Sequence, residues 1–149
     1  MASDYLFLCQ PFSAMSVTSV FELFKLRNAI FIVEQNCVYQ DIDQLDLEAH
    51  HIVMCDQNKV IGCSRFFINQ EDQLQIGRLA LDRAYRQQAL GKQLFQYTLT
   101  QSQSIFPEKT LMLSSQKHLT AFYQQFGFNP IGDEFLEDNI PHQHMIKKQ

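Results

Sequence analysis

Strand-like and helix-like hydrophobic patterns alternate along the whole chain, and this alternation restricts the fold more than any single motif. We expect strands at residues 5–9, 51–55, 60–68, 74–81, 110–114, 128–132 and 142–146, and helices at residues 16–33, 89–104 and 115–126. Interleaved elements of this kind predict an α/β (or α+β) fold with a mixed central sheet of six to seven strands and flanking helices. Because 149 residues is a usual length for one domain, we expect a single domain over residues 1–149.

The expected N-caps of the first and last helices are Ser16 and Ser115, and the expected C-terminal stop of the last is Gly127. One face of the first helix carries the apolar residues Val17, Val20, Phe21, Phe24 and Phe31.

The composition argues against several classes of protein. Apolar residues make up 46% of the chain and charged residues 19%, which supports a packed core rather than disorder. A net charge of −4 argues against a general nucleic-acid binder, and the lack of a run of 18 apolar residues argues against a membrane-spanning helix. The four cysteines form no Cys-x-x-Cys pair, which favours reduced thiols in a cytoplasmic protein, and the histidine spacing predicts no metal site.

The strand expected at residues 74–81 changes its alternation in the middle. Leu74 and Ile76 share one parity, whereas Leu79 and Leu81 share the other. An extra residue in the strand produces such a shift, and glycine is favoured in one common type of β-bulge. We therefore predict a bulged strand with the bulge near Gly77. A strand that is buried on both faces and has no bulge is the alternative.

Residues 79–92 combine a strand, a short loop and the start of a helix, which suits the binding of an anion. Unpaired backbone N–H groups and the helix dipole both favour negative charge at a helix start. Residues 73–92 also carry four basic side chains and one acidic one, which suits a pyrophosphate. The segment is neither a P-loop nor a dinucleotide fingerprint. An ordinary solvated helix start is the alternative.

Four motifs carry a resemblance to a known family. Residues 86–91 (Arg-Gln-Gln-Ala-Leu-Gly) resemble the Gln/Arg-x-x-Gly-x-Gly/Ala acyl-CoA loop of the GNAT N-acetyltransferase superfamily. Residues 26–43, 116–128 and 137–145 resemble, in this order, three longer motifs of its ElaA-like family. The resemblance implies the GNAT acyl-CoA N-acyltransferase fold, with acetyl-CoA as cosubstrate and a primary amine as acceptor.

The resemblance also implies where the cosubstrate binds. Backbone groups of Leu79, Ala80 and Leu81 would hold the pantetheine, and the bulge would open a slot for the thioester. The pyrophosphate would lie on Arg86, Gln87, Gln88, Ala89, Leu90, Gly91 and Lys92. Two residues depart from the family pattern. Ala89 replaces a glycine and is tolerated there only at a negative φ, and Asn139 replaces a glycine where asparagine tolerates a left-handed conformation.

Acyl transfer to an amine needs a base for the ammonium group and an acid for the departing thiolate. The resemblance makes Tyr123 the acid. Its alternative is a core role, because Tyr123 shares a helical face with apolar neighbours. The candidate bases are Glu34, His51 and Glu137, and the candidates for binding the acceptor are Arg27, Gln116, Asp138 and His142. We expect Arg27 to pair with a carboxylate such as Glu34.

The distribution of charge bears on the acceptor. Residues 28–58 contain six acidic side chains and no lysine or arginine. They predict either a negative mouth that attracts a cationic amine or a solvated acidic loop. The expected activity is acetylation of a small-molecule or peptide amine by direct attack in a ternary complex, with a homodimer as one assembly to consider. A CoA-binding sensor with little catalysis and a protein N-terminal acetyltransferase are the alternatives.

Overall fold

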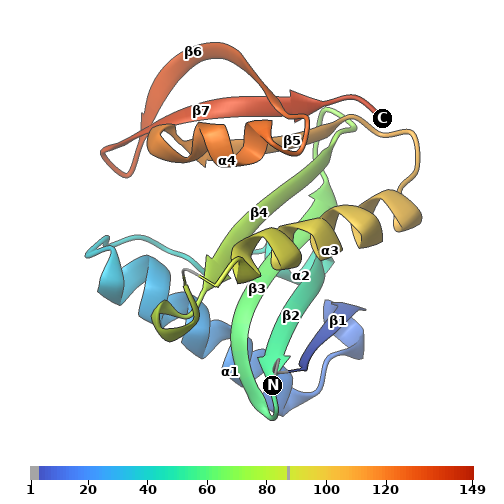
Figure 1. Ribbon diagram of the computed structural model, residues 1–149, viewed down its shortest axis with the longest axis vertical. Coiled ribbons are helices and arrows are strands. Elements are labelled where there is room, and N and C mark those ends of the chain that lie inside the picture. Colours follow the sequence, from blue (N-terminus) through green and yellow to red (C-terminus); the bar gives the residue numbers. More distant parts are fainter. Residues whose placement is uncertain (1–3, 87) are drawn as a thin grey trace.

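The computed structural model describes residues 4–86 and 88–149, which form a seven-stranded sheet with helices on both faces (Figure 1). The strands are β1 (Tyr5–Pro11), β2 (His50–Asp56), β3 (Lys59–Ile68), β4 (Leu74–Leu81), β5 (Leu111–Gln116), β6 (Asn129–Glu137) and β7 (Ile140–Lys147). The helices are α1 (Val17–Arg27), α2 (Leu45–Glu48), α3 (Leu90–Ile105) and α4 (Thr120–Gln124), with a π-helical segment at Asn28–Glu34 and 3-10 turns at Phe12–Ala14, Arg83–Tyr85 and Lys117–Leu119.

The order of the strands confirms the predicted mixed sheet. The order is β1-β2-β3-β4-β5-β7-β6, in which β4 and β5 run parallel and the other neighbouring pairs run antiparallel. The chain reaches β5 from β4 through α3, which is the crossover that a parallel pair requires. Within the described part of the chain, no helix is long and apolar enough to cross a bilayer.

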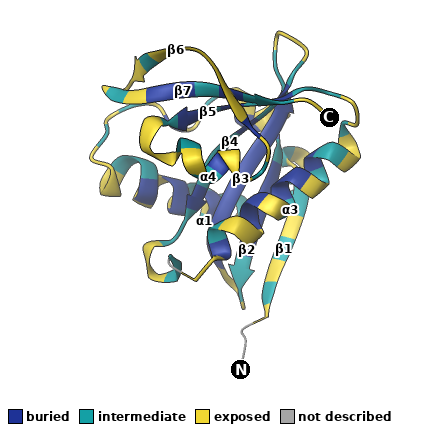
Figure 2. Cartoon of the chain, turned by 45° about the horizontal axis from the view of Figure 1, so that its top comes forward, coloured by how far each residue is buried: buried dark blue, intermediate teal, exposed yellow. Residues whose placement is uncertain are grey.

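The two faces of the sheet carry separate hydrophobic cores. On one face, Leu23 and Leu26 of α1 belong to a cluster with Val53 of β2. On the other face, α3 and α4 cover a larger cluster that includes Ile52 and Met54 of β2. Successive residues of a strand point to opposite faces, so β2 contributes to both cores. The central strands are accordingly the most deeply buried part of the molecule (Figure 2).

Helix α1 begins where predicted but buries a face that is only partly the predicted one. The hydroxyl oxygen of Ser16 accepts a hydrogen bond from the backbone N–H of Ser19 at 3.1 Å, so Ser16 is the predicted N-cap. The predicted apolar face is right only in part: Phe24 and Phe31 pack against the core, but Val17 is 88% exposed and Phe21 is 61% exposed. Apolar residues occur on both sides of this helix, and the buried side is the one that also carries Arg27.

The bulge predicted in β4 is confirmed. The β3–β4 register pairs Cys63 with Ala80 and Arg65 with Gly77. Between these pairs, the single residue Ser64 of β3 lies opposite two residues of β4, Arg78 and Leu79. The left-handed residue of the bulge is Arg78, with φ of 51°, and not the preceding Gly77. On its other side, β4 pairs with β5 only through its first two residues. Beyond the bulge, β4 and β5 therefore separate.

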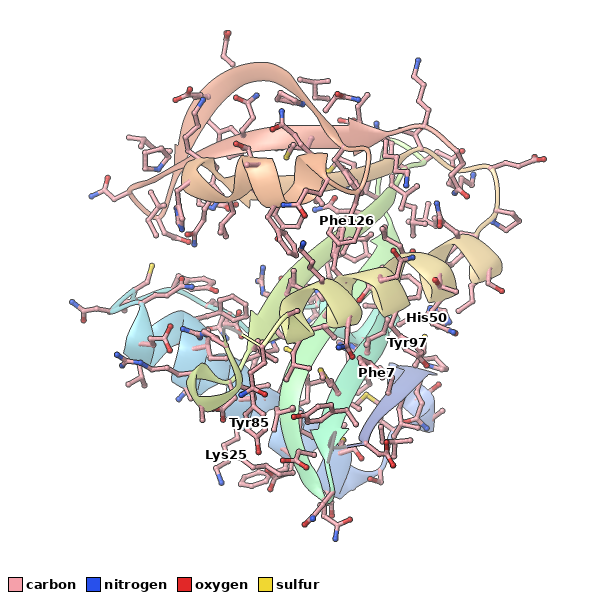
Figure 3. All side chains as sticks on the ribbon, in the orientation of Figure 1. Phe7, Lys25, His50, Tyr85, Tyr97 and Phe126 are labelled. Carbon is pink, nitrogen blue, oxygen red and sulfur yellow. The ribbon has the colours of Figure 1, made fainter. Side chains whose placement is uncertain are left out.

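Helix α3 lies across one face of the sheet and is fixed by aromatic contacts at both of its sides. The ring of Tyr97 stacks on Phe7 of β1 with centroids 4.9 Å apart (Figure 3). On the side of α4, Phe95 meets Phe126 in an edge-to-face contact at 4.9 Å. These contacts place the N-terminus of α3 beside the end of β4.

The last third of the chain differs from the prediction at one helix start. Ser115 is not a helix cap, because it is a buried residue of β5 and the following helix begins with a 3-10 turn. Gly127, with φ of 91°, ends α4 as predicted. The β6–β7 hairpin closes through a two-residue turn in which Asp138 and Asn139 have φ of 50° and 65°. Positive φ at both turn residues is typical of a type I′ turn and suits asparagine.

Candidate active site

A cavity of about 650 Å³ opens where β4 and β5 separate. Its walls come from the π-helical segment, β4, β5, the start of α4 and the β6–β7 turn, which are far apart in the sequence but adjacent in the fold (Figure 1). Ten of the predicted site residues line this cavity: Glu34, Leu79, Ala80, Leu81, Arg86, Gln116, Tyr123, Glu137, Asp138 and His142.

Two of the predicted catalytic and acceptor-binding residues, Arg27 and His51, do not line the cavity. Arg27 is only 1% exposed, and its guanidinium lies 3.0 Å from Asp41 and 2.7 Å from Asp46. Arg27 therefore pairs with carboxylates as expected, but its partners are Asp41 and Asp46 and not Glu34. His51 is equally buried, with Nε2 2.8 Å from the backbone oxygen of Asp46. Both residues support the fold behind the site.

Of the six acidic side chains in the acidic segment (residues 28–58), only Glu34 lines the cavity, and Glu48 is exposed. Three of the segment's carboxylates are counterions of arginines on α1, β3 and β4, and we call these six residues the arginine–aspartate cluster: Arg27, Arg65, Arg78, Asp41, Asp43 and Asp46. Of the remaining acidic side chains, Glu34 pairs with Arg86, and Asp56 accepts a hydrogen bond from Tyr85. Spacing within the segment could not show this, because every partner is distant in the sequence.

Asp46 is the centre of the arginine–aspartate cluster. Its two carboxylate oxygens accept hydrogen bonds from Arg27 at 2.7 and 3.1 Å, and one of them accepts from Arg65 at 2.8 Å. Burial opposes the ionisation of Asp46. These bonds and the backbone N–H of Asp43 outweigh burial and lower its pKa to about 2. Asp46 is thus a buried carboxylate whose charge is fully compensated.

Of the four basic side chains in and next to the predicted phosphate-binding segment, Arg78 and Arg86 line the cavity. The guanidinium of Arg86 donates to the Leu81 carbonyl at 3.0 Å and to Glu34 at 2.8 Å. Arg78 instead turns toward the arginine–aspartate cluster, and the side chains of Gln88, Ala89 and Lys92 are exposed. Leu90 is buried in the core, Gly91 lies in the first turn of α3, and Gln87 lies outside the described residues.

Ala89 has a left-handed conformation, with φ of 59° and ψ of 14°. The expectation of a negative φ at this N-cap position is therefore wrong. A left-handed residue with a Cβ costs roughly 1–2 kcal/mol relative to glycine, because the Cβ crowds the following carbonyl. This strained residue immediately precedes the N-terminus of α3, which would face a pyrophosphate.

We expect Ala89→Gly to stabilise the protein by about 1 kcal/mol and to raise its melting temperature by a few degrees. Thermal unfolding followed by circular dichroism measures the change. Gly91→Ala is the matched control, because Gly91 has no positive φ and a Cβ there would meet no atom within 4 Å. An Ala89→Gly protein that melts below the wild type contradicts this reading of the loop.

Tyr123 packs in the core and also lines the cavity. Its ring packs edge-to-face on Phe95 and Phe122, each with centroids 5.1 Å apart, so it belongs to the core. It also lines the cavity, where burial raises its pKa to about 12. Its hydroxyl forms no hydrogen bond with another residue that the structure describes, which leaves the proton available to a molecule in the cavity.

The β6–β7 turn forms the opposite wall of the cavity. Nε2 of His142 lies 3.2 Å from a carboxylate oxygen of Glu137, and Nδ1 lies 2.7 Å from the Ile140 carbonyl. Because a carbonyl only accepts, Nδ1 carries a hydrogen. Nε2 is then the ring atom that exchanges a proton. Sequence reasoning did not single out Tyr39 and His118, which also line the cavity, although they lie within the motifs at residues 26–43 and 116–128.

Comparisons with known proteins agree with this geometry. Residues 21–149 match the family described as "Acetyltransferase (GNAT) domain". The chain is 38% identical over 140 residues to Protein ElaA of Escherichia coli, which covers 91% of this chain and 92% of that protein. The crystal structure of Escherichia coli ElaA superposes with a TM-score of 0.92 at 35% identity, over 97% of this chain and 100% of that one.

A second solved structure shows the same fold. An acyl-CoA N-acyltransferase from Pseudomonas aeruginosa matches with a TM-score of 0.93 and 32% identity, over 97% of this chain and 99% of that one. Both the sequence match and the structural match extend over nearly the whole chain. The chain therefore belongs to the GNAT acetyltransferase family and, within it, to the ElaA-like proteins.

Proposed function

We propose that this protein transfers an acetyl group from acetyl-CoA to the primary amine of a small-molecule or peptide acceptor, by direct attack in a ternary complex. The observation that carries the proposal is the cavity itself. It joins the bulged end of β4, the guanidinium of Arg86 and the hydroxyl-bearing ring of Tyr123 in one continuous space. These are the groups that an acyl-CoA and a departing thiolate require.

The residues around the cavity fit an acyl-CoA molecule. Residues 78 and 79 have no paired partner in β3 or β5 within the described register, so β4 can offer backbone groups to an extended pantetheine arm. Arg86 and the start of α3 suit the diphosphate. The bound acyl-CoA would supply an activated acyl group as a thioester.

The acceptor would enter between the π-helical segment and the β6–β7 turn. Glu34 lies on one side of the cavity, and Glu137 and Asp138 lie on the other. An entrance flanked by three carboxylates favours a cationic amine. The cavity thus keeps the predicted preference for cations, although the acidic residues that supply it are not those of the arginine–aspartate cluster.

The Glu137–His142 pair is the better placed of the candidate bases. Glu34 is engaged by Arg86, which the diphosphate also needs, and His51 does not reach the cavity. In the neutral ring, with the hydrogen on Nδ1, Nε2 of His142 carries a lone pair beside the Glu137 carboxylate. We propose that this atom takes the proton of the incoming ammonium group, with Glu137 stabilising the imidazolium that results.

Arg86→Ala should weaken the binding of acetyl-CoA by about 10-fold or more, because a charge-assisted hydrogen bond to phosphate contributes about 1.5–3 kcal/mol. Isothermal titration calorimetry measures the dissociation constant. Arg83→Ala is the matched control, because Arg83 is an exposed arginine three residues away that does not line the cavity. Equal affinities of the two variants would contradict the proposed diphosphate site.

The activity itself is tested by a broad amine screen, with mass detection of acetylated product and a parallel assay for free thiol. Acetylation of small amines supports the proposal as stated. Acetylation of peptide N-termini alone assigns the protein to the N-terminal acetyltransferases. Binding of acetyl-CoA without thiol release for any amine overturns the enzyme and leaves a CoA-binding sensor, for which the strained Ala89 would be the structural reason.

A further inference from the structure

The residue at the left-handed position of the β4 bulge is an arginine where glycine would be the easier choice. In the common bulge that uses this conformation, the left-handed residue is a glycine. Here Gly77 stands one position earlier and has no positive φ, and Arg78 has φ of 51°. Backbone preference does not explain this arrangement, because exchanging the two residue types would remove the strain. The side chain of Arg78 must therefore contribute something that glycine lacks.

That contribution is a set of contacts with the acidic segment. Nε of Arg78 lies 2.8 Å from Oδ1 of Asp41, and Nη2 donates to the Asp41 backbone carbonyl at 3.0 Å and to Asp43 at 3.4 Å. The Nε–H does not point along the line to Oδ1, so this contact is an ion pair rather than a hydrogen bond. Asp41 thus holds the guanidinium through both its side chain and its backbone.

Asp41 is itself rigidly placed. Its Oδ2 accepts a hydrogen bond from Nε of Arg27 at 3.0 Å, and its Oδ1 accepts from the hydroxyl of Tyr39 at 2.9 Å. The backbone carbonyl of Arg78 also accepts from the buried thiol of Cys63 at 3.4 Å. The bulge is therefore fixed through the side chain of Arg78 on one side and through its backbone on the other.

We propose that Asp41 and Arg78 act as a positioning pair for acyl transfer, by holding the bulge so that the backbone N–H of Leu79 meets the acyl carbonyl. The inference rests on the proposed function and adds a role for the acidic segment. Arg78 and Leu79 both line the cavity, directly next to the place where β4 leaves β5. An error of about 1 Å in such a donor can lower turnover about 100-fold.

Three variants test whether Arg78 acts by positioning the bulge, through the strain of its backbone, or through its charge alone. Arg78→Gly supplies the residue that the backbone prefers but removes the contacts with Asp41. Arg78→Lys keeps the charge, but a lysine cannot contact both the side chain and the backbone carbonyl of Asp41. Asp41→Asn keeps Arg78 and removes its counterion. Arg65→Lys is the matched control, because Arg65 binds Asp43 and Asp46 of the same cluster and lies on β3, opposite Gly77, rather than in the bulged strand β4.

We expect kcat to fall about 10- to 100-fold in the three test variants, with the dissociation constant of acetyl-CoA changed less than about 3-fold, because the diphosphate site is intact. Hydrogen–deuterium exchange of the free protein should show faster exchange at residues 77–81 in the test variants than in Arg65→Lys. Arg78→Gly should melt near the wild-type temperature, because removing the strain offsets the lost ion pair.

Full activity of Arg78→Gly, with unchanged exchange at residues 77–81, overturns the proposal, because backbone conformation alone would then set the bulge. An equal loss of kcat in Arg65→Lys also overturns it, since the cluster would then act only through general stability. The exchange measurement needs no activity. If the wild type transfers no acetyl group, the proposed function fails, and faster exchange in the test variants still shows that Asp41 and Arg78 hold the bulge.

Discussion

Asp46→Ala is expected to destabilise the protein by about 3–5 kcal/mol, the usual cost of removing one partner from a buried ion pair. Asp46 is 1% exposed, and it binds the guanidiniums of both Arg27 and Arg65. Its loss leaves two buried guanidiniums with one carboxylate partner each, Arg27 with Asp41 and Arg65 with Asp43. A melting temperature lowered by about 10 °C or more is the expected result in thermal unfolding.

The pH dependence of stability checks the same carboxylate without a mutation. The folded pKa of Asp46 is lowered to about 2, so its contribution to stability is present above the unfolded pKa of about 4 and is lost as pH falls through the folded value. The shift corresponds to about 2 kcal/mol. The difference in unfolding free energy between wild type and Asp46→Ala should therefore shrink between pH 4 and pH 2.

Lys109→Ala is the control for this prediction. It breaks the exposed pair between Lys109 and Asp72, whose charged atoms lie 2.6 Å apart. Exposed pairs contribute about 1 kcal/mol or less, so this variant should melt close to the wild type. A loss of stability in Asp46→Ala no larger than that of Lys109→Ala would show that the arginine–aspartate cluster is not a structural centre.

The predictions that hold are those that depend on local pattern. The change of parity between Ile76 and Leu79 locates the bulge, because a strand cannot shift its alternation without an extra residue. The cap at Ser16 and the stop at Gly127 follow from local backbone chemistry in the same way. Motif spacing likewise brings most of the predicted site residues to one cavity.

The predictions that fail depend on partners that are distant in the sequence. Arg27 and Asp46 are 19 residues apart, and Arg86 and Glu34 are 52 residues apart, so no helical or strand period relates them. The sequence shows that residues 28–58 are acidic, but it does not show which arginines pair with the carboxylates. The error about which face of α1 is buried has the same cause, because hydrophobic periodicity does not show that this helix buries Arg27 against carboxylates.

The conformation of Ala89 could not be predicted from its residue type. Alanine usually avoids a left-handed φ, and local reasoning therefore favours a negative value. The surrounding structure over-determines the position, because β4 and α3 must be joined by a short loop that also forms a 3-10 turn at Arg83–Tyr85. Strain of this kind is held in place by its neighbours and is found most often at functional sites.

Tyr123→Phe is expected to lower kcat about 100-fold or more, which is the usual contribution of a positioned acid. The pKa of Tyr123 is raised to about 12 by burial, whereas a thiol such as that of CoA has a pKa near 8.5. Complete proton transfer from the phenol to the free thiolate is thus uphill. We therefore expect the hydroxyl to act by donating a hydrogen bond to sulfur as negative charge develops there.

The high pKa also predicts the shape of the pH profile. Because Tyr123 keeps its proton throughout the usual range of assay, wild-type kcat should show no alkaline fall assignable to this residue below about pH 10. Phenylalanine preserves the ring contacts with Phe95 and Phe122, so the melting temperature of the variant should change little. A 100-fold loss of kcat at unchanged stability would show that the hydroxyl of Tyr123 acts in the reaction. Unchanged turnover would leave Tyr123 with a packing role alone.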